Sequence, residues 1–186
     1  MPISALLGLL YFLSELGLQI FKRAKSGAAR TEDGGSLAVL WLVGTASMFA
    51  AFRFQFSVPQ TSWPWQPWVN DLGIVLLLLG LAVRWYSIIY LGRYFTVNVA
   101  IATDHKLIDT GPYRAVRHPS YTGALLAFLG LAICMQNWAS ALILMTGTTA
   151  AFLYRMRVEE RALTSAFGDR YRQYQQRTAR LIPGMY

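Results

Sequence analysis

The sequence predicts an all-α integral membrane protein with about five transmembrane helices, the last two forming a tight helical hairpin, and a C-terminal amphipathic helix in the cytoplasm. Two observations concern composition: 55% of the 186 residues are hydrophobic, and the mean hydropathy is +0.36, which is too apolar for an ordinary soluble domain. A third is that lysines and arginines flank long apolar runs. Membrane topology and contact with anionic lipid head groups therefore explain the net charge of +8 better than nucleic-acid binding does.

Five apolar runs define the expected spans, and each has about 15 to 20 residues, close to the ~20 that cross a hydrocarbon core. They cover residues 3–21, 37–52, 72–91, 121–135 and 138–154. Because two residues, Gln136 and Asn137, separate the last two runs, we expect a hairpin there. Residues 155–177 then carry apolar positions at helical spacing, which predicts an amphipathic helix with a break at Gly168-Asp169.

Basic residues near the span ends set the expected orientation. They follow the first and the third spans: Lys22, Arg23, Lys25, Arg30, Arg93, Lys106, Arg114 and Arg117. We therefore expect the N-terminus outside and the C-terminus in the cytoplasm. The loop between the second and third spans holds Trp63, Trp65 and Trp68, which is typical of an outer interfacial belt. No basic stretch precedes the first run, so that run is expected to be a retained anchor and not a signal peptide.

Two charged residues lie inside expected spans, where an unpaired charge costs about 3 kcal/mol. Glu15 falls in the inner half of the first span and Arg84 in the inner half of the third. Their matching depth leads to the hypothesis that they form an ion pair. Cys134, the single cysteine, lies in an apolar run and has no partner in the chain for a disulfide.

The junction at residues 111–123 is the strongest candidate for a functional site. It packs two prolines, two glycines, two tyrosines, two arginines and His118 into the boundary between a polar loop and an apolar run. Pro119 fits the first turn of the following helix, whose free N–H groups could hold a ligand carboxylate or hydroxyl. His105 and His118 could suggest a metal pair, but the chain has no HExxH motif and no cysteine cluster, so no metal is expected.

Glu159 and Glu160 allow two interpretations from the residues alone. As a solvated helix face they would pair with Arg155, Arg157 and Arg161. If Glu159 and Glu160 lie at the water-facing end of the membrane helices, opposite His118, they could instead bind a cationic cofactor.

Three ordered motifs resemble the isoprenylcysteine carboxyl methyltransferase family and, in part, related phospholipid methyltransferases. They are His105 to Tyr113 with the sequence HKLIDTGPY, Arg117 to Gly123 with RHPSYTG, and Glu159-Glu160 ahead of Phe167 to Tyr171 with FGDRY. The likeness covers residues 91–183. Within one membrane domain of residues 1–186, it implies that 71–186 form the catalytic core, whereas 1–70 hold two spans and the Trp- and Pro-rich loop.

This resemblance implies a membrane-embedded methyltransferase that uses S-adenosylmethionine and releases S-adenosylhomocysteine. No GxGxxG motif of the soluble dinucleotide-binding fold is present. Carried over by motif, the cofactor contacts would be Asn98, His105, Leu107, Ile108, Tyr113, His118, Pro119, Tyr121 and Glu159. Arg155 matches the position that would meet an acceptor carboxylate, and a one-turn shift in alignment would exchange it with Arg157.

The expected acceptor is lipophilic: a prenylated cysteine, an isoprenoid acid or a phospholipid. A carboxylate is ionised at neutral pH and needs no base, whereas a phospholipid amine would need His118 or Glu160 as a base. The arginine favours a carboxylate. An NADPH-dependent sterol-type reductase, which shares a Tyr and Arg-His-Pro junction, and a non-catalytic membrane scaffold are the competing interpretations.

Overall fold

The computed structural model describes residues 3–21, 29–31, 33–64, 66–97, 100–102 and 106–184. Five long helices dominate it, and shorter elements connect them. In chain order the elements are α1 (Ile3–Phe21), β1 (Ala29–Thr31), α2 (Ser36–Ser57), η1 (Pro59–Thr61), α3 (Pro67–Leu91), η2 (Gly92–Tyr94), β2 (Ala100–Ala102), α4 (Pro112–Ala115), α5 (Pro119–Cys134), α6 (Trp138–Phe167) and α7 (Asp169–Arg177).

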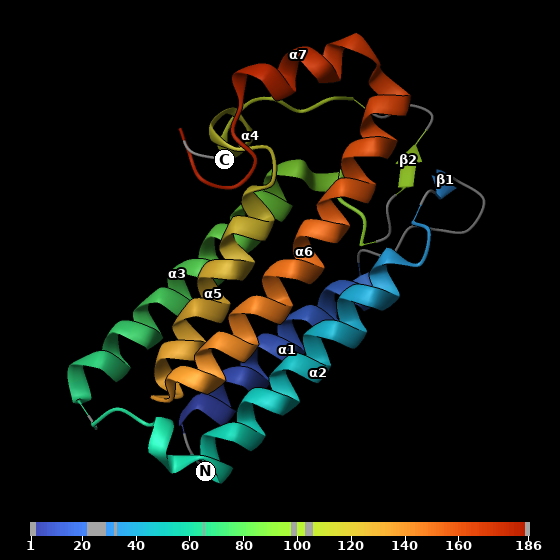
Figure 1. The fold of residues 1–186 in the computed structure, drawn as a ribbon. Helices are drawn as coiled ribbons and strands as arrows, with labels where there is room; N and C mark the ends of the chain where they lie inside the picture. The colour runs from blue at the N-terminus through green and yellow to red at the C-terminus, as the bar shows by residue number, and fades with distance from the viewer. Residues whose placement is uncertain are drawn as a thin grey trace.

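The long helices form one elongated bundle (Figure 1). α3 packs along α5, α2 packs along α6, and α1 lies against α5. The strands β1 and β2, α4, α7 and the C-terminus gather at one end, and the N-terminus lies at the other. We call the end with α7 the polar end.

Local signals in the sequence explain where the helices begin and end. Pro67 and Pro119 each occupy the first turn of a helix, α3 and α5, where a missing N–H costs nothing. Asn137 caps α6 by accepting a hydrogen bond from Ser140 N at 2.9 Å, which makes the tight turn after α5. Gly168, with φ of 55°, ends α6 before α7. The predicted hairpin and the predicted break at Gly168-Asp169 are therefore confirmed.

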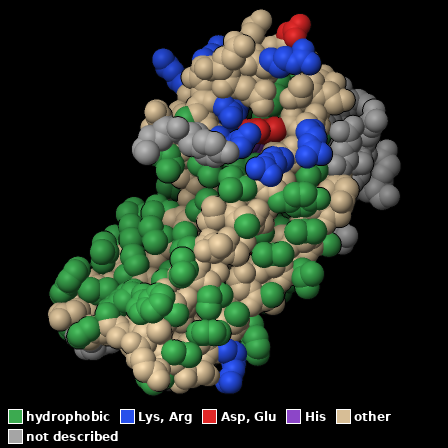
Figure 2. Space-filling model, viewed as in Figure 1, with side chains coloured by type: hydrophobic (Ala, Val, Ile, Leu, Met, Phe, Trp, Pro, Cys, Tyr) green, Lys and Arg blue, Asp and Glu red, His purple; other side chains and the backbone are tan. Residues whose placement is uncertain are grey.

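The flank of the bundle is apolar, as a lipid-facing surface must be. Figure 2 shows hydrophobic side chains over the helices, with Lys and Arg gathered mainly at the polar end. Leu42 and Phe49 on α2 and Ile89 on α3 are about 70% exposed, which water would penalise and a bilayer would not. Within the described residues, two helical stretches are long and apolar enough to cross a membrane, Ser36–Ser57 and Pro67–Tyr94.

The five predicted spans all fall on long helices, but five complete crossings stay a prediction. The apolar parts of α1 and α5, Ala5–Leu18 and Pro119–Cys134, are shorter than a typical span. The helices α2 and α3 extend beyond their predicted ranges, because the apolar runs end before the helical hydrogen bonding does. The expectation of a purely helical chain misses one feature: β1 and β2 pair antiparallel, with Arg30 opposite Ile101.

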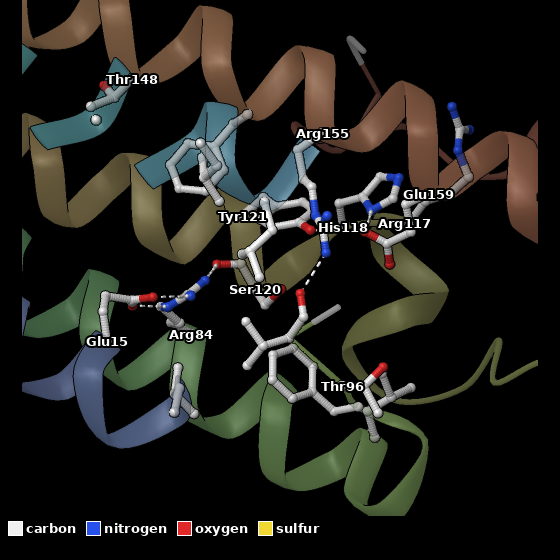
Figure 3. Close-up of a pocket in the computed structure, with 18 of the residues that line it drawn as sticks. Glu15, Arg84, Thr96, Arg117, His118, Ser120, Tyr121, Thr148, Arg155 and Glu159 are labelled. Atoms are coloured by element: carbon white, nitrogen blue, oxygen red, sulfur yellow. Dashed lines mark hydrogen bonds and ion pairs between the residues drawn. The ribbon is translucent and has the colours of Figure 1, made fainter. Parts of the chain in front are cut away.

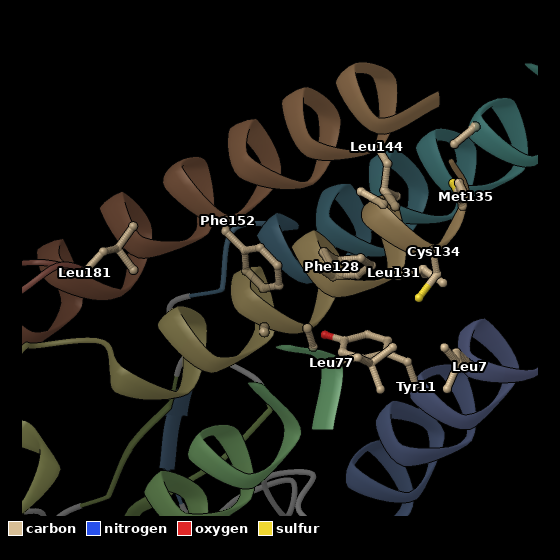
Figure 4. Packing of buried hydrophobic residues seen from close by; sticks show 14 of the residues in the cluster. Leu7, Tyr11, Leu77, Phe128, Leu131, Cys134, Met135, Leu144, Phe152 and Leu181 are labelled. Carbon is tan, nitrogen blue, oxygen red and sulfur yellow. The ribbon is translucent and has the colours of Figure 1, made fainter. Parts of the chain in front are cut away.

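Small residues set the spacing between α3 and α5. A Cβ atom added at Gly80 would lie 2.3 Å from Ala127 N and 2.6 Å from Gly123 O, so the two backbones are in direct contact. Gly123 and Gly130 of α5 meet α3 in the same way. Close backbone approach through small residues is a common way for membrane helices to associate. Around this contact lies the hydrophobic core, where Leu77, Phe128 and Leu131 pack between the helices (Figure 4).

The predicted ion pair between Glu15 and Arg84 is confirmed. Arg84 donates from Nε to Glu15 Oε1 at 2.6 Å and from Nη2 to Glu15 Oε2 at 2.7 Å, and its Nη1 donates to Ser120 O at 3.2 Å. This bidentate pair joins α1 to α3 and α5 within the apolar bundle. Trp85 Nε1 adds a second link to α1 by donating to Ser14 Oγ at 2.8 Å.

Substituting Gly80→Ala tests the contact between α3 and α5. The added methyl must push against the α5 backbone, so we expect a cost of about 1 to 3 kcal/mol and a thermal midpoint in detergent lowered by roughly 5 °C. Gly17→Ala is the matched control, because nothing lies within 4 Å of a Cβ at Gly17. Equal midpoints for the two variants would contradict the proposed packing.

Candidate functional site

One cavity of about 240 Å³ runs from the polar end into the helix bundle. Its polar side is lined by charged and aromatic side chains, including Lys106, Tyr113, His118, Arg155 and Glu159. Its other side is lined by apolar side chains of α1, α2, α5 and α6: Gly8, Phe12, Leu40, Trp41, Gly44, Met48, Phe128 and Phe152. The cavity therefore joins a polar compartment to an apolar one.

The labelled side chains in Figure 3 follow this change in character. The Glu15–Arg84 pair lies on one side, and Arg117, His118 and Glu159 lie on the other. Ser120, Tyr121 and Arg155 come between them. Ionic groups thus border the cavity on both sides of its centre.

The Glu160 carboxylate is the centre of a cluster of charged and polar groups at the polar end. It is buried and accepts from Arg117 Nε at 3.1 Å and from Arg180 Nη2 at 2.6 Å, and its Oε1 lies 3.1 Å from His118 Nε2. Burial alone would raise the pKa of Glu160, but the hydrogen bonds from His118 and Arg180 outweigh it and lower the pKa to about 2. Glu160 therefore stays ionised and holds three positive or hydrogen-bonding groups in place.

Backbone hydrogen bonds bind the same region to the C-terminal segment 178–181. Arg117 N donates to Ala179 O at 2.8 Å, and His118 N donates to Arg180 O at 3.1 Å. The Arg117 guanidinium also donates to Thr178 O and, at 2.9 Å, to Gln175 O. These hydrogen bonds join the residues at the start of α5 to the segment 178–181, and both segments contact Glu160.

Glu159 takes a different position from its neighbour and faces the cavity. Its side chain is 33% exposed, and its Oε2 accepts from the Tyr121 hydroxyl at 2.9 Å. His118 stacks on Tyr121 with ring centroids 5.5 Å apart, and its Nδ1 lies 3.9 Å from Glu159 Oε2. The result is a carboxylate beside aromatic faces, a combination that suits a cationic ligand.

The structure separates the two residues of the acidic pair. Of the two interpretations, the solvated helix face does not hold for Glu160, which is buried and pairs with Arg117, just before α5, and with Arg180 of the C-terminal segment. Helical spacing describes one helix and cannot show which other elements pack against it. Glu159 lines the cavity.

Three tyrosines close the cavity at the polar end. Tyr113 and Tyr174 are joined by a hydrogen bond from the Tyr174 hydroxyl to Tyr113 O at 2.6 Å, and Tyr171 and Tyr174 pack on Leu107. Burial raises the pKa of all three hydroxyl groups, so they remain neutral. The Tyr171 hydroxyl is buried and has no hydrogen-bond partner among the described residues, although Tyr171 lines the cavity. Such an atom is a natural contact for a polar ligand.

Arg155 is buried at the boundary between the polar and apolar sides. Its guanidinium donates to Asp33, to the Ser36 hydroxyl and to Val97 O. Arg157 is exposed and lies on a shallow surface depression with Glu160 and Arg161. Of the two arginines, Arg155 is the one that lines the cavity.

The structure brings together most of the residues expected at the site. Those that line the cavity are Leu107, Ile108, Tyr113, His118, Tyr121, Arg155 and Glu159. Pro119 is buried at the start of α5, where it shapes the helix that carries Tyr121. Asn98 and His105 lie outside the described residues. The described part of the chain contains no group of three His, Cys, Asp or Glu that could hold a metal ion.

Comparison with known proteins identifies similar chains. The sequence profile of the isoprenylcysteine carboxyl methyltransferase family matches residues 73–165. Protein-S-isoprenylcysteine O-methyltransferase B of Arabidopsis thaliana is 34% identical over 118 residues, which are 62% of this chain and 60% of that protein. The Schizosaccharomyces pombe protein-S-isoprenylcysteine O-methyltransferase is 35% identical over 133 residues, which are 70% of this chain and 52% of that protein. The chain therefore spans between half and three fifths of the length of these curated relatives.

A solved structure has a similar fold. It is described as the eukaryotic intramembrane Ras methyltransferase ICMT, and it is 28% identical in sequence, with a TM-score of 0.60. The match covers 77% of this chain and 52% of that one.

Acid titration tests the role of Glu160. Its pKa of about 2, below the ordinary 4.5, is equivalent to roughly 3 kcal/mol of stabilisation, which is present above pH 4.5 and lost as the pH falls toward 2. Glu160→Gln lacks this contribution, so we expect its thermal midpoint to be lower than that of the wild type at pH 7 and the gap to narrow below pH 4.5. A gap that is constant from pH 7 to pH 3 would contradict the ionised cluster.

Proposed function

Because the chain belongs to the isoprenylcysteine carboxyl methyltransferase family, we propose that it is a membrane-embedded methyltransferase that uses S-adenosylmethionine to methylate a carboxylate of a lipophilic acceptor. The acceptor would be a prenylated cysteine or an isoprenoid acid. The observation that carries this proposal is a cavity whose polar side holds Glu159 and whose other side is lined by apolar side chains around the Glu15–Arg84 pair.

The chemistry of the polar side fits the cofactor. S-adenosylmethionine supplies, when bound, a methyl group on a positively charged sulfur. Glu159 offers a carboxylate to a cationic ligand, and the rings of Tyr113 and Tyr121 line the same side of the cavity. The buried Tyr171 hydroxyl has no partner in the described residues, so a polar ligand would satisfy it. We assign cofactor binding to Leu107, Ile108, Tyr113, His118, Tyr121 and Glu159, with Pro119 as support.

The apolar side fits the chain of the acceptor. Phe12, Trp41, Met48 and Phe152 line it, the two charges that border it, Glu15 and Arg84, are paired with each other, and Arg155 lies at its polar boundary. An isoprenoid chain in this side would leave its carboxylate near the arginine. Bidentate hydrogen bonds from a guanidinium would then orient the carboxylate.

The residues of the cavity need not supply a base for this reaction. A carboxylate is ionised at neutral pH, so alignment and the exclusion of water are the main requirements. An amine acceptor would first lose a proton, and both candidate bases are engaged. Glu160 binds Arg117 and Arg180, and the Nε2 atom of His118 lies within hydrogen-bonding distance of Glu160. These contacts favour a carboxylate acceptor over a phospholipid amine.

We place the site at the cytoplasmic face. The basic residues gather at the polar end, which is the pattern of a cytoplasmic surface. The water-soluble cofactor would reach the polar side from the cytoplasm, and the lipophilic acceptor would reach the apolar side from the bilayer. The N-terminus then lies outside and the C-terminus inside.

Calorimetric titration with S-adenosylhomocysteine tests the cofactor class. We expect micromolar affinity in the wild type, weakened at least tenfold in Glu159→Gln because the ammonium group of the ligand's amino-acid part loses its carboxylate. Asp71→Asn is the control, since Asp71 is exposed near the start of α3, away from the polar end. Binding of NADPH in place of S-adenosylhomocysteine would replace the proposal with a reductase, and binding without turnover on any acceptor would favour a scaffold.

The two arginines can be separated by matched substitutions. With N-acetyl-S-farnesylcysteine as acceptor, we expect Arg155→Lys to lower kcat/KM by roughly 30-fold, because lysine cannot make the bidentate contact. Arg157→Lys should leave kcat/KM unchanged. Affinity for S-adenosylhomocysteine should be retained in both variants. The opposite ranking would transfer the acceptor role to Arg157.

A further inference from the structure

Asp33 is the charged partner of Arg155, which lines the cavity, and it comes from a part of the chain outside the family match. It lies between β1 and α2, whereas the family profile begins at residue 73. Its Oδ1 atom accepts from Arg155 Nη1, in a contact where the side-chain exposure is 3% for the arginine and 13% for the aspartate. Breaking a charge pair this deeply buried by removing one partner would leave an uncompensated charge.

The hydrogen bonds of Arg155 show which part of its guanidinium remains for a ligand. A guanidinium has five N–H donors. Nη1 uses both of its donors, on Asp33 and on the Ser36 hydroxyl, and Nη2 uses one on Val97 O. The donor on Nε and the second donor on Nη2 remain, and the Tyr121 hydroxyl also interacts with the guanidinium. A carboxylate that enters beside Tyr121 can bridge these two nitrogens.

We propose that Asp33 is a positioning residue for the acceptor: it holds Nη1 of Arg155 so that the Nε and Nη2 donors are fixed for the acceptor carboxylate. This inference rests on the proposed carboxyl methylation. Without Asp33 the guanidinium could turn, and fewer of its donors would meet the acceptor carboxylate at once, so binding of the acceptor would weaken.

Asp33 has a structural role that the test must separate from the proposed one. Its Oδ2 atom accepts from Leu37 N at 3.2 Å, and its backbone carbonyl accepts from Ser36 N at 2.8 Å, so it helps to cap the first turn of α2 from a position two residues before the N-cap residue Gly35. Serine and asparagine cap helices as well as aspartate does. Asp33→Ser keeps a cap but is too short to reach Arg155. Asp33→Asn keeps both the cap and a neutral acceptor for Arg155.

Steady-state kinetics with N-acetyl-S-farnesylcysteine and binding of S-adenosylhomocysteine test the proposal together. We expect Asp33→Ser to raise the KM for the acceptor about tenfold, as loss of a charge-assisted hydrogen bond implies, and Asp33→Asn to raise it less. The affinity for S-adenosylhomocysteine and the thermal midpoint should stay at wild-type values in both. Asp169→Asn is the control, because Asp169 is an exposed aspartate at the start of α7, paired with exposed Arg172.

Each other outcome overturns the proposal in a distinct way. A lower KM for the acceptor in Asp33→Ser would mean that Asp33 blocks the place of the acceptor carboxylate. If Asp33→Ser lost cofactor affinity and thermal stability together, the role of Asp33 would be only structural, at the start of α2. An unchanged KM in an active enzyme would reject the positioning role of Asp33 and leave the proposed function standing. A wild-type protein that methylates no carboxylate would overturn the proposed function as well.

Discussion

The ionised Glu160 carboxylate is the interaction on which the polar end depends. A buried charge is stable only when it is paired, and Glu160 is paired with Arg117 and Arg180 beside His118. These partners come from the start of α5 and from the C-terminal segment, so one carboxylate fixes two distant parts of the chain. With Glu160 committed to this cluster, Glu159 is left facing the cavity, next to His118 and Tyr121.

The same constraint operates deeper in the bundle. Arg84 lies within the apolar helices and is satisfied by Glu15 and by Ser120 O, which ties α1 to the close-packed pair α3 and α5. Arg155 between these two clusters donates to Asp33, Ser36 and Val97 O. Each of these three sets of paired charges contributes at least one side chain to the lining of one cavity, and the apolar side chains of the lining provide space for a lipophilic acceptor. In the proposed function this arrangement lets a cation and a lipid meet at one place.

Two kinds of feature could be predicted from the sequence: those set by local residue types, and those set by the depth of a charged residue within a membrane span. The hairpin at Gln136 and Asn137 and the break at Gly168 follow from local residue types, and the Glu15–Arg84 pair follows from equal depth in two spans. The partners of Glu160 and the contact of Asp33 with Arg155 could not, because they join segments 20 to 122 residues apart through tertiary packing. Asp33 precedes a helix, which predicts a cap, but no pattern indicates an arginine facing it. The short strands β1 and β2 lack the alternating pattern that identifies strands.

The most direct test of the central claim is the chemical nature of the methylated product. Purified protein in detergent would be incubated with methyl-labelled S-adenosylmethionine and N-acetyl-S-farnesylcysteine, and the extracted product treated with alkali. A methyl ester releases its label as volatile methanol, whereas a methylated amine keeps it. Our account predicts volatile label that depends on the acceptor. Alkali-stable label in a lipid amine, or binding of S-adenosylhomocysteine with no label transferred, would contradict it.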